Sequence, residues 1–189
     1  MIAANADGEG TPSIESRLSV VIEFCNSAVL LHGSDELREP ESAARWLAAR
    51  GYVLGGDASA LSRLREEREV LRGFLCARAD SETLARFNEV AQRHVAGARI
   101  GADGNLELLP LGGAADMAGA ATVALLTWGS GAEGARLKVC AAPECRWAYY
   151  DTSRSRSRSW CDMNVCGVRH KMREYRARKD SASHDTSAL

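Results

Sequence analysis

Four cysteines near the C-terminal end have the spacing of a metal site. They form two pairs, Cys140 with Cys145 and Cys161 with Cys166, and each pair encloses four residues. Thiolates are soft ligands, and Zn²⁺ binds four of them in a tetrahedron. Because sulfur would occupy all four positions, none would remain for a substrate or an activated water. The spacing therefore predicts one structural zinc ion.

Two other interpretations of these cysteines are free core thiols and a pair of disulfides. The first twelve residues are polar and glycine-rich, and the chain has no apolar run of membrane-spanning length. We therefore expect a cytoplasmic protein with no signal peptide and no membrane contact. Thiols stay reduced in the cytosol, which favours zinc over disulfides. Cys25 and Cys76 lie in apolar helical patterns far from the cluster, and we expect both to be core residues.

A hairpin and a helix must position the four ligands. Residues 147–150 favour a strand, residues 151–153 a polar turn, and residues 159–160 the return to the second cysteine pair. Residues 168–179 then show helical periodicity. A hairpin between the two pairs and a helix at the last ligands predict a treble-clef-like finger.

The predicted helix has two different faces. Val168, Met172 and Tyr175 form an apolar stripe that we expect to pack on the hairpin. Arg169, Arg173 and Arg176 repeat the same spacing one residue later and form a basic ridge. The chain from residue 136 to residue 179 carries twelve lysines and arginines against four acidic residues, whereas the remainder carries twelve against twenty-one. This asymmetry indicates a polyanionic partner, or attraction between the two parts of the chain.

The C-terminal motifs resemble the CGNR-type zinc finger, which ends bacterial proteins described as stress-induced transcription regulators. The resemblance lies in Cys140-x4-Cys145, the run from Tyr149 to Arg154, Trp160-Cys161-x4-Cys166-Gly167-x-Arg169-x-Lys171, and Arg176-x-Arg178. Val168 stands where the family has asparagine, and Ala148 where it has an aromatic residue. The resemblance implies transcription regulation in a stress response.

A second resemblance lies near the N-terminus. Residues 23–27 are similar to the signature that opens the ABATE domain of the same proteins. Asn26 either faces a pocket, fixes a neighbouring backbone, or is a buried amide that a loop satisfies. We treat Asn26 and Trp46 as a candidate ligand pocket for a small-molecule effector.

We expect a mainly α fold with small β-hairpins. A helical N-terminal domain spans residues 1–134, the zinc finger spans residues 135–180, and a disordered tail spans residues 181–189. The predicted helices begin at residues 13, 40, 58, 81 and 114, the first of them ends near Leu31, and a hairpin lies near 98–109. We expect the charged run 65–69 to be a solvated face and His94 to be a helix-end residue.

No P-loop, Rossmann fingerprint, nucleophile elbow, paired carboxylates or Cys/His dyad is evident in the sequence. We therefore expect a non-enzymatic DNA-binding regulator, acting alone or as a homodimer. Its alternatives are a protein-interaction module and a ligand-binding N-terminal sensor. Alternating serines and arginines at 153–159 either reach phosphates or form a solvated tip. The candidate DNA contacts are Arg154, Arg156, Arg158, Arg169, Lys171, Arg173, Arg176 and Arg178.

Overall fold

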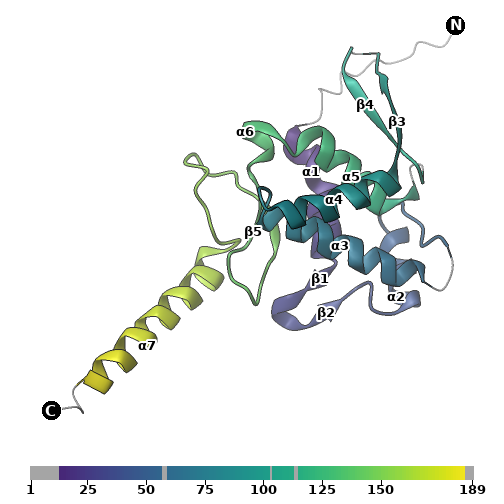
Figure 1. The fold of residues 1–189 in the computed structure, drawn as a ribbon. Coiled ribbons are helices and arrows are strands. Elements are labelled where there is room, and N and C mark those ends of the chain that lie inside the picture. Colours follow the sequence, from purple (N-terminus) through teal and green to yellow (C-terminus); the bar gives the residue numbers. More distant parts are fainter. Residues whose placement is uncertain (1–12, 57–58, 103, 113–114, 186–189) are drawn as a thin grey trace, which may run out of the picture.

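Helices form the body of the molecule, and antiparallel pairs of short strands connect them (Figure 1). The computed structural model describes residues 13–56, 59–102, 104–112 and 115–185. The predicted mainly α fold with small hairpins is confirmed. The helices are α1 (Ile14–Asn26), α2 (Pro40–Ala48), α3 (Ala60–Cys76), α4 (Ser81–His94), α5 (Met117–Trp128), α6 (Gly131–Gly134) and α7 (Val168–Asp185).

The strands pair with their neighbours in the sequence. They are β1 (Ala28–Val29) with β2 (Ser34–Asp35), β3 (Val95–Ile100) with β4 (Leu106–Pro110), and β5 (Leu137–Val139) with β6 (Ala148–Tyr150). A 3₁₀ turn, η1 (Leu30–His32), separates β1 from β2, and a π-helical turn, η3 (Met163–Gly167), precedes α7. Within the described residues, no helix is long and apolar enough to span a bilayer.

Local side chains define where several helices begin. Ser13, Asp80 and Asp116 each accept a hydrogen bond from a backbone N–H in the first turn of α1, α4 and α5, respectively. Pro40 begins α2, where its missing N–H costs nothing. The end of α1 was predicted wrongly. The helix ends at Asn26 rather than near Leu31, because the next residues pair as β1 with β2.

The core surrounds α1, which packs against α3 and α5. Leu18, Val21, Phe24 and Cys25 of α1 are buried there, with small residues of α5 facing them. Burial raises the pKa of the Cys25 thiol to about 12, so it remains protonated. Cys25 is therefore a core residue as expected. Cys76, the last residue of α3, is exposed and does not belong to the core.

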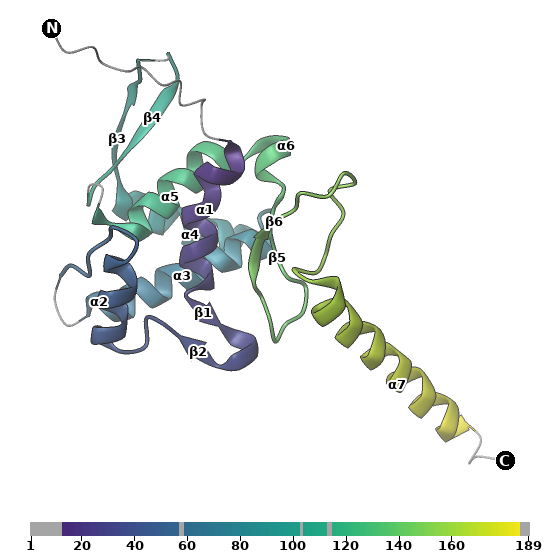
Figure 2. The same ribbon diagram turned by 180° about the vertical axis from the view of Figure 1, so that it is seen from behind.

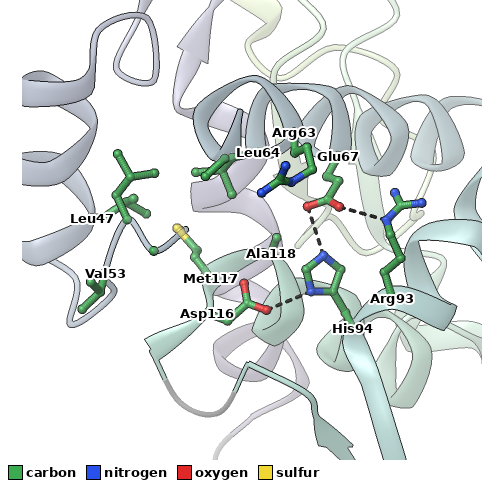
Figure 3. Close-up of a pocket in the computed structure, with 13 residues that line it drawn as sticks. Leu47, Val53, Arg63, Leu64, Glu67, Arg93, His94, Asp116, Met117 and Ala118 are labelled. Atoms are coloured by element: carbon green, nitrogen blue, oxygen red, sulfur yellow. Dashed lines mark hydrogen bonds and ion pairs between the residues drawn. The ribbon is translucent and has the colours of Figure 1, made fainter. Parts of the chain in front are cut away.

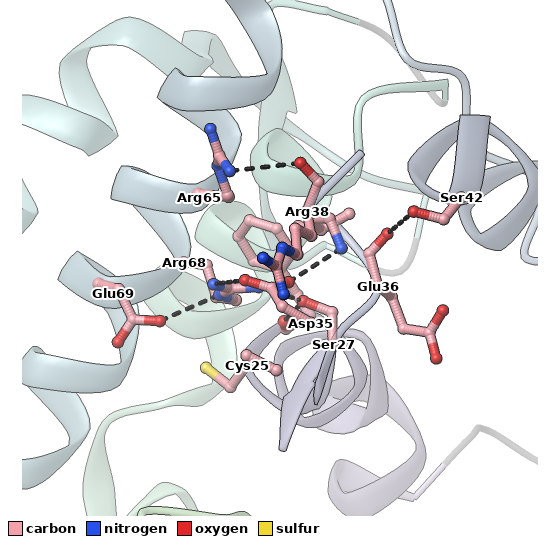
Figure 4. A network of polar contacts seen from close by, with 12 residues as sticks. Cys25, Ser27, Asp35, Glu36, Arg38, Ser42, Arg65, Arg68 and Glu69 are labelled. Carbon is pink, nitrogen blue, oxygen red and sulfur yellow. Dashed lines mark hydrogen bonds and ion pairs between the residues drawn. The ribbon is translucent and has the colours of Figure 1, made fainter. Parts of the chain in front are cut away.

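Glu67 and Arg68 of the run 65–69 are buried, contrary to the expected solvated face, whereas Glu66 is exposed. Arg68 donates to both carboxylate oxygens of Asp35, at 2.6 and 2.8 Å (Figure 4). Arg72 is 0% exposed and donates to the carbonyls of Cys25 and Ala28 and to Glu69. Arg72 satisfies backbone oxygens at the end of α1 and in β1, and Arg68 also donates to the Ser27 hydroxyl between them. The charged run thus connects α3 to α1 and to the β1–β2 hairpin.

The finger and the helical body share one core. Leu137 of β5 and Ala148 of β6 are both buried with the residues of α1 and α3. The hairpin of the finger was expected to lie between the two cysteine pairs, with residues 147–150 leading to residues 159–160. Instead β6 pairs with β5, so the two strands flank the first cysteine pair.

Helix α7 extends away from the rest of the molecule (Figures 1 and 2). It was expected to pack its apolar stripe on the hairpin, but Val168, Met172 and Tyr175 are 47%, 46% and 58% exposed. The helix continues to Asp185, five residues into the stretch 181–189 that we expected to be a disordered tail. The expected frayed residues 1–12, and residues 186–189, lie outside the described part of the chain.

Candidate metal centre and nucleic-acid interface

The four predicted ligands converge on one point. The Sγ atoms of Cys140, Cys145, Cys161 and Cys166 all lie within 4.8 Å of one another. Cys145 and Cys161 are 3.7 Å apart, and Cys161 and Cys166 are 3.8 Å apart. A tetrahedron with Zn–S bonds of about 2.3 Å has edges of about 3.8 Å. All four cysteines are free rather than disulfide-bonded. The donor set and its spacing therefore fit one structural zinc ion.

Tight turns bring the ligands together. The N–H groups of Cys145 and Arg146 both donate to the carbonyl of Ala142, at 2.9 and 3.1 Å. Arg146 has a φ of 46°, which closes this turn in the left-handed region.

The second turn begins at Asp162, whose carboxylate accepts from the N–H groups of Asn164 and Val165. This cap starts η3 and places Cys166 at the entrance to α7. A side chain at Gly167 would collide with Met163 Sδ and would lie 3.3 Å from Trp160. A larger residue at this position would therefore have to displace the Met163 side chain, which is 55% exposed.

The site must lose protons when it binds zinc. Burial raises the pKa of the Cys166 thiol to about 12, and burial also raises the pKa of the Cys161 thiol. Burial also acts on Cys140, but N–H donors from Cys161 and Ala142 outweigh it and lower the pKa of Cys140. Zn²⁺ binds thiolates, so protons and metal compete for the same sulfurs. Zinc affinity should consequently weaken in acid.

Asp151 organises the loop between β6 and the second cysteine pair. Its side chain is 0% exposed. It accepts from Lys138 Nζ at 2.8 Å and from the N–H groups of Ser153 and Arg158, each at 3.0 Å. Although burial opposes ionisation, Lys138 and the N–H donors lower the pKa of Asp151. The sequence predicts Asp151 only as part of a polar turn and gives no sign that it is the centre of the loop.

The segment of alternating serines and arginines at residues 153–159 is therefore held in place at several points. Lys138 Nζ also donates to the carbonyls of Arg156 and Arg158, at 2.6 and 3.2 Å. Arg156 pairs with Glu133 at 2.8 Å, and Arg158 donates to the carbonyl of Cys161 at 2.5 Å. Arg156 and Arg158 therefore stabilise the finger, although both residues are exposed.

The eight candidate DNA contacts form two groups. All eight are exposed. Arg154, Arg156 and Arg158 lie in the loop before the second cysteine pair, and this loop and α7 point in different directions (Figure 2). The α7 group is Arg169, Lys171, Arg173, Arg176 and Arg178. Of these, Arg173 pairs with Glu144 of the same finger at 2.8 Å.

Asn26 connects the helical body to the finger. Its amide nitrogen donates to the carbonyl of Ala148, and its amide oxygen accepts from the Ala148 N–H, both at 2.8 Å. Among the alternatives considered, Asn26 fixes a neighbouring backbone. Trp46 lies under the Arg50 guanidinium, 4.1 Å from ring centroid to Cζ. Neither residue lines the cavity drawn in Figure 3.

That cavity contains a cluster that sequence analysis missed. His94 does end α4 as expected, but its ring lies between the carboxylates of Glu67 and Asp116 (Figure 3). The three residues come from α3, from the end of α4, and from the residue that caps α5. The sequence offers only a weak signal for this cluster, namely His94 at the end of one helix and Asp116 at the N-cap of another.

Two family models match the chain. The model for "CGNR zinc finger" matches residues 136–179. The ABATE model, described as "Putative stress-induced transcription regulator", matches residues 18–139. The two matches overlap in β5, the strand that contributes Leu137 to the core of the body. Both descriptions concern regulators or zinc fingers rather than enzymes. A comparison with curated proteins found no match.

Proposed function

The chain belongs to the ABATE family and carries its CGNR zinc finger, and from this premise we propose that it binds duplex DNA through helix α7. The observation that carries the proposal is the arrangement of side chains around this projecting helix. Zinc holds the start of α7, and the helix leaves the body with its basic residues exposed.

Two basic rows flank the apolar stripe of α7. Successive residues of an α-helix are rotated by about 100°. On this geometry Arg169, Arg173 and Arg176 form one row, and Lys171 and Arg178 lie on nearly the opposite side. Val168, Met172 and Tyr175 fall in the arc between the two rows. Glu174 and His170 lie on the remaining side, where His170 contacts Trp160 of the finger at 4.7 Å between ring centroids.

This arrangement suits the major groove of DNA. The groove is about 12 Å wide and admits an α-helix between two rows of phosphates. The two basic rows can then face the two strands, while the apolar stripe faces the base edges, where thymine methyl groups offer apolar contact. An α-helix of 18 residues is about 27 Å long, enough to follow the groove across several base pairs.

The exposure of the ridge also bears on the protein-interaction alternative. Docking of the ridge on the acidic body of the same chain would bury these arginines, and they are exposed. The finger instead contacts the body through β5, β6 and Asn26. A single zinc finger makes a small footprint on DNA, so we propose that two copies act together on DNA in the cytoplasm and regulate transcription during stress.

The test measures binding of the zinc-loaded chain to duplex DNA by fluorescence anisotropy over a range of salt concentrations. Each phosphate contact contributes about −0.9 to the slope of log affinity against log salt. Arg169→Ala and Lys171→Ala, one from each basic row, should each weaken binding and reduce the slope by about 1.

Two further variants complete this experiment. Met172→Ala should weaken binding without changing the salt slope, because it removes an apolar contact. Arg99→Ala, in an exposed ion pair with Glu107 on the β3–β4 hairpin, is the matched control and should bind as wild type. The proposal fails if the chain does not bind DNA at low salt, or if the α7 variants behave like Arg99→Ala.

A further inference from the structure

A pocket of about 420 Å³ lies where the finger meets the β1–β2 hairpin, and three of the four metal-binding cysteines line it. We call it the sulfur pocket. Its other lining residues come from β1 and η1 of the body and from the finger: Val29, Leu31, His32, Trp147, Tyr149, Asp162 and Val165. Most of these side chains are aliphatic or aromatic. The lining therefore suits a small molecule with an apolar body rather than an ion.

The sulfur pocket opens onto one face of the sulfur tetrahedron. Cys145, Cys161 and Cys166 line it, and Cys140 is not among its lining residues. Cys161 is half-buried, whereas the other three cysteines are buried. The sulfur of Cys140 instead accepts hydrogen bonds from the N–H groups of Cys161 and Ala142. Cys161 is therefore the ligand that a molecule in the pocket reaches most easily.

Cys161 also has two close sulfur neighbours. Its Sγ lies 3.7 Å from that of Cys145 and 3.8 Å from that of Cys166, and both neighbours line the same pocket. An alkylating reagent would use one sulfur only. A two-electron oxidant uses two, and here it could join Cys161 to either neighbour within the finger. The arrangement therefore favours an oxidant.

We propose that the sulfur pocket admits a small organic hydroperoxide to Cys161. The apolar body of the hydroperoxide contacts Leu31, Trp147 and Val165, and its peroxide group lies at the Cys161 sulfur. The Cys161 thiolate attacks the terminal oxygen, the O–O bond breaks, and the alkoxide leaves and takes a proton from water. Cys161 is then a sulfenic acid.

A second step completes the oxidation. The thiolate of Cys145 or Cys166 attacks the sulfenic sulfur, a disulfide forms, and hydroxide leaves. In total, two thiolates lose two electrons, and the hydroperoxide is reduced to an alcohol and hydroxide. Only two of the four thiolates remain, too few for a structural zinc site. Since Cys166 directly precedes α7, the start of that helix would also lose its anchor. The inference requires the zinc site but not DNA binding.

The test follows zinc release from the full zinc-loaded chain with a colorimetric chelator, and compares cumene hydroperoxide with hydrogen peroxide at equal concentration. Cumene hydroperoxide should release zinc about ten-fold faster, the factor expected from burial of about two methylene groups. Peptide mass spectrometry of the product should show a disulfide that includes Cys161. The proposal is overturned if hydrogen peroxide is at least as fast, or if Cys161 stays reduced.

Two neighbouring leucines of η1 then locate the reaction. Leu31 lines the sulfur pocket, whereas Leu30 is 39% exposed and does not line it. Leu31→Gln makes the wall more polar, so it should slow the reaction with cumene hydroperoxide about five-fold and leave that with hydrogen peroxide unchanged. Leu30→Gln is the matched control and should react as wild type.

Circular dichroism and zinc content check that both variants keep the fold and the metal. If Leu31→Gln reacts with cumene hydroperoxide as fast as wild type, the pocket does not select the reagent and the proposal is overturned. A faster reaction of Leu31→Gln with both reagents would indicate a loosened finger and would overturn it equally.

Discussion

At the scale of single residues, a few polar side chains decide how the finger and the body fit together. Asn26 pairs with both backbone groups of Ala148, and Asp151 gathers Lys138 and two N–H donors around one carboxylate. A polar group buried without a partner costs about 1–3 kcal/mol, so each of these residues matters more than its own hydrogen bonds suggest.

Replacing Asn26 by alanine should destabilise the protein by about 2–3 kcal/mol, because the N–H and carbonyl of buried Ala148 lose their partner. Urea denaturation of the zinc-loaded chain measures this change. Asn88→Ala, at an exposed position of α4, is the control and should alter stability by less than about 0.5 kcal/mol. An equal effect of both substitutions would contradict the role given to Asn26.

His94 should make stability depend on pH above neutrality. The pKa of His94 is raised in the folded chain to about 9, and an unfolded histidine titrates near 6.5. Its contribution is therefore complete below about pH 6.5 and is lost as pH rises through about 9. Allowing for solvent in the cavity, the loss should be roughly 1–2 kcal/mol.

Denaturation at several pH values between 6 and 10 tests this expectation. His94→Asn keeps Glu67 and Asp116 but removes the titrating ring, so its stability should vary less with pH than that of wild type. The comparison uses the change in the free energy of unfolding with pH rather than its absolute value, because the substitution itself also destabilises the cluster. Parallel profiles for the two proteins would be inconsistent with a charged His94.

At the scale of elements, α3 has contacts on several sides. Arg63 and Glu67 face the cavity, and Arg68 and Arg72 bond to the end of α1 and the β1–β2 hairpin. Arg78, just after the helix, donates to the carbonyls of Gly134 and Leu137 at the entrance to the finger. Residues of α3, together with the adjacent Arg78, thus contact the cavity, the core and the start of the finger.

Replacing Arg72 by methionine should destabilise the protein by about 3–5 kcal/mol, since it leaves the buried carbonyls of Cys25 and Ala28 without their donor and removes a partner of Glu69. Arg65→Met on the same helix makes only weaker, more exposed contacts and should cost less than about 1 kcal/mol. Thermal unfolding monitored by circular dichroism compares the two. Similar losses would show that α3 is not anchored through Arg72.

At this scale, the features that could be predicted from the sequence are those with a local signal. The helix starts at residues 40 and 81 and the four cysteines could each be predicted from a few neighbouring residues. Prediction failed where the deciding partner is distant in sequence. Arg68 meets Asp35 across 33 positions, and His94 meets Glu67 across 27, and neither pairing leaves a periodic pattern. The same reason explains why the buried face of α3 looked solvated.

At the scale of the whole molecule, the zinc site lies between the body and α7. Its ligands follow β5, whose Leu137 belongs to the core of the body, and its last ligand precedes α7 directly. The metal therefore fixes the direction in which the basic helix leaves the molecule. Periodicity identified the apolar stripe of α7, but it could not tell whether the stripe covers the finger or faces outward, because that depends on the direction in which the chain leaves η3.

The most direct test of the account is the DNA affinity of the full chain before and after zinc removal under reducing conditions, followed by zinc addition. Without the metal, the four thiols no longer hold the start of α7, so affinity should fall about ten-fold or more and recover when zinc is returned. A zinc-free chain that binds DNA as tightly as the zinc-loaded chain would contradict the claim that the metal presents the basic helix.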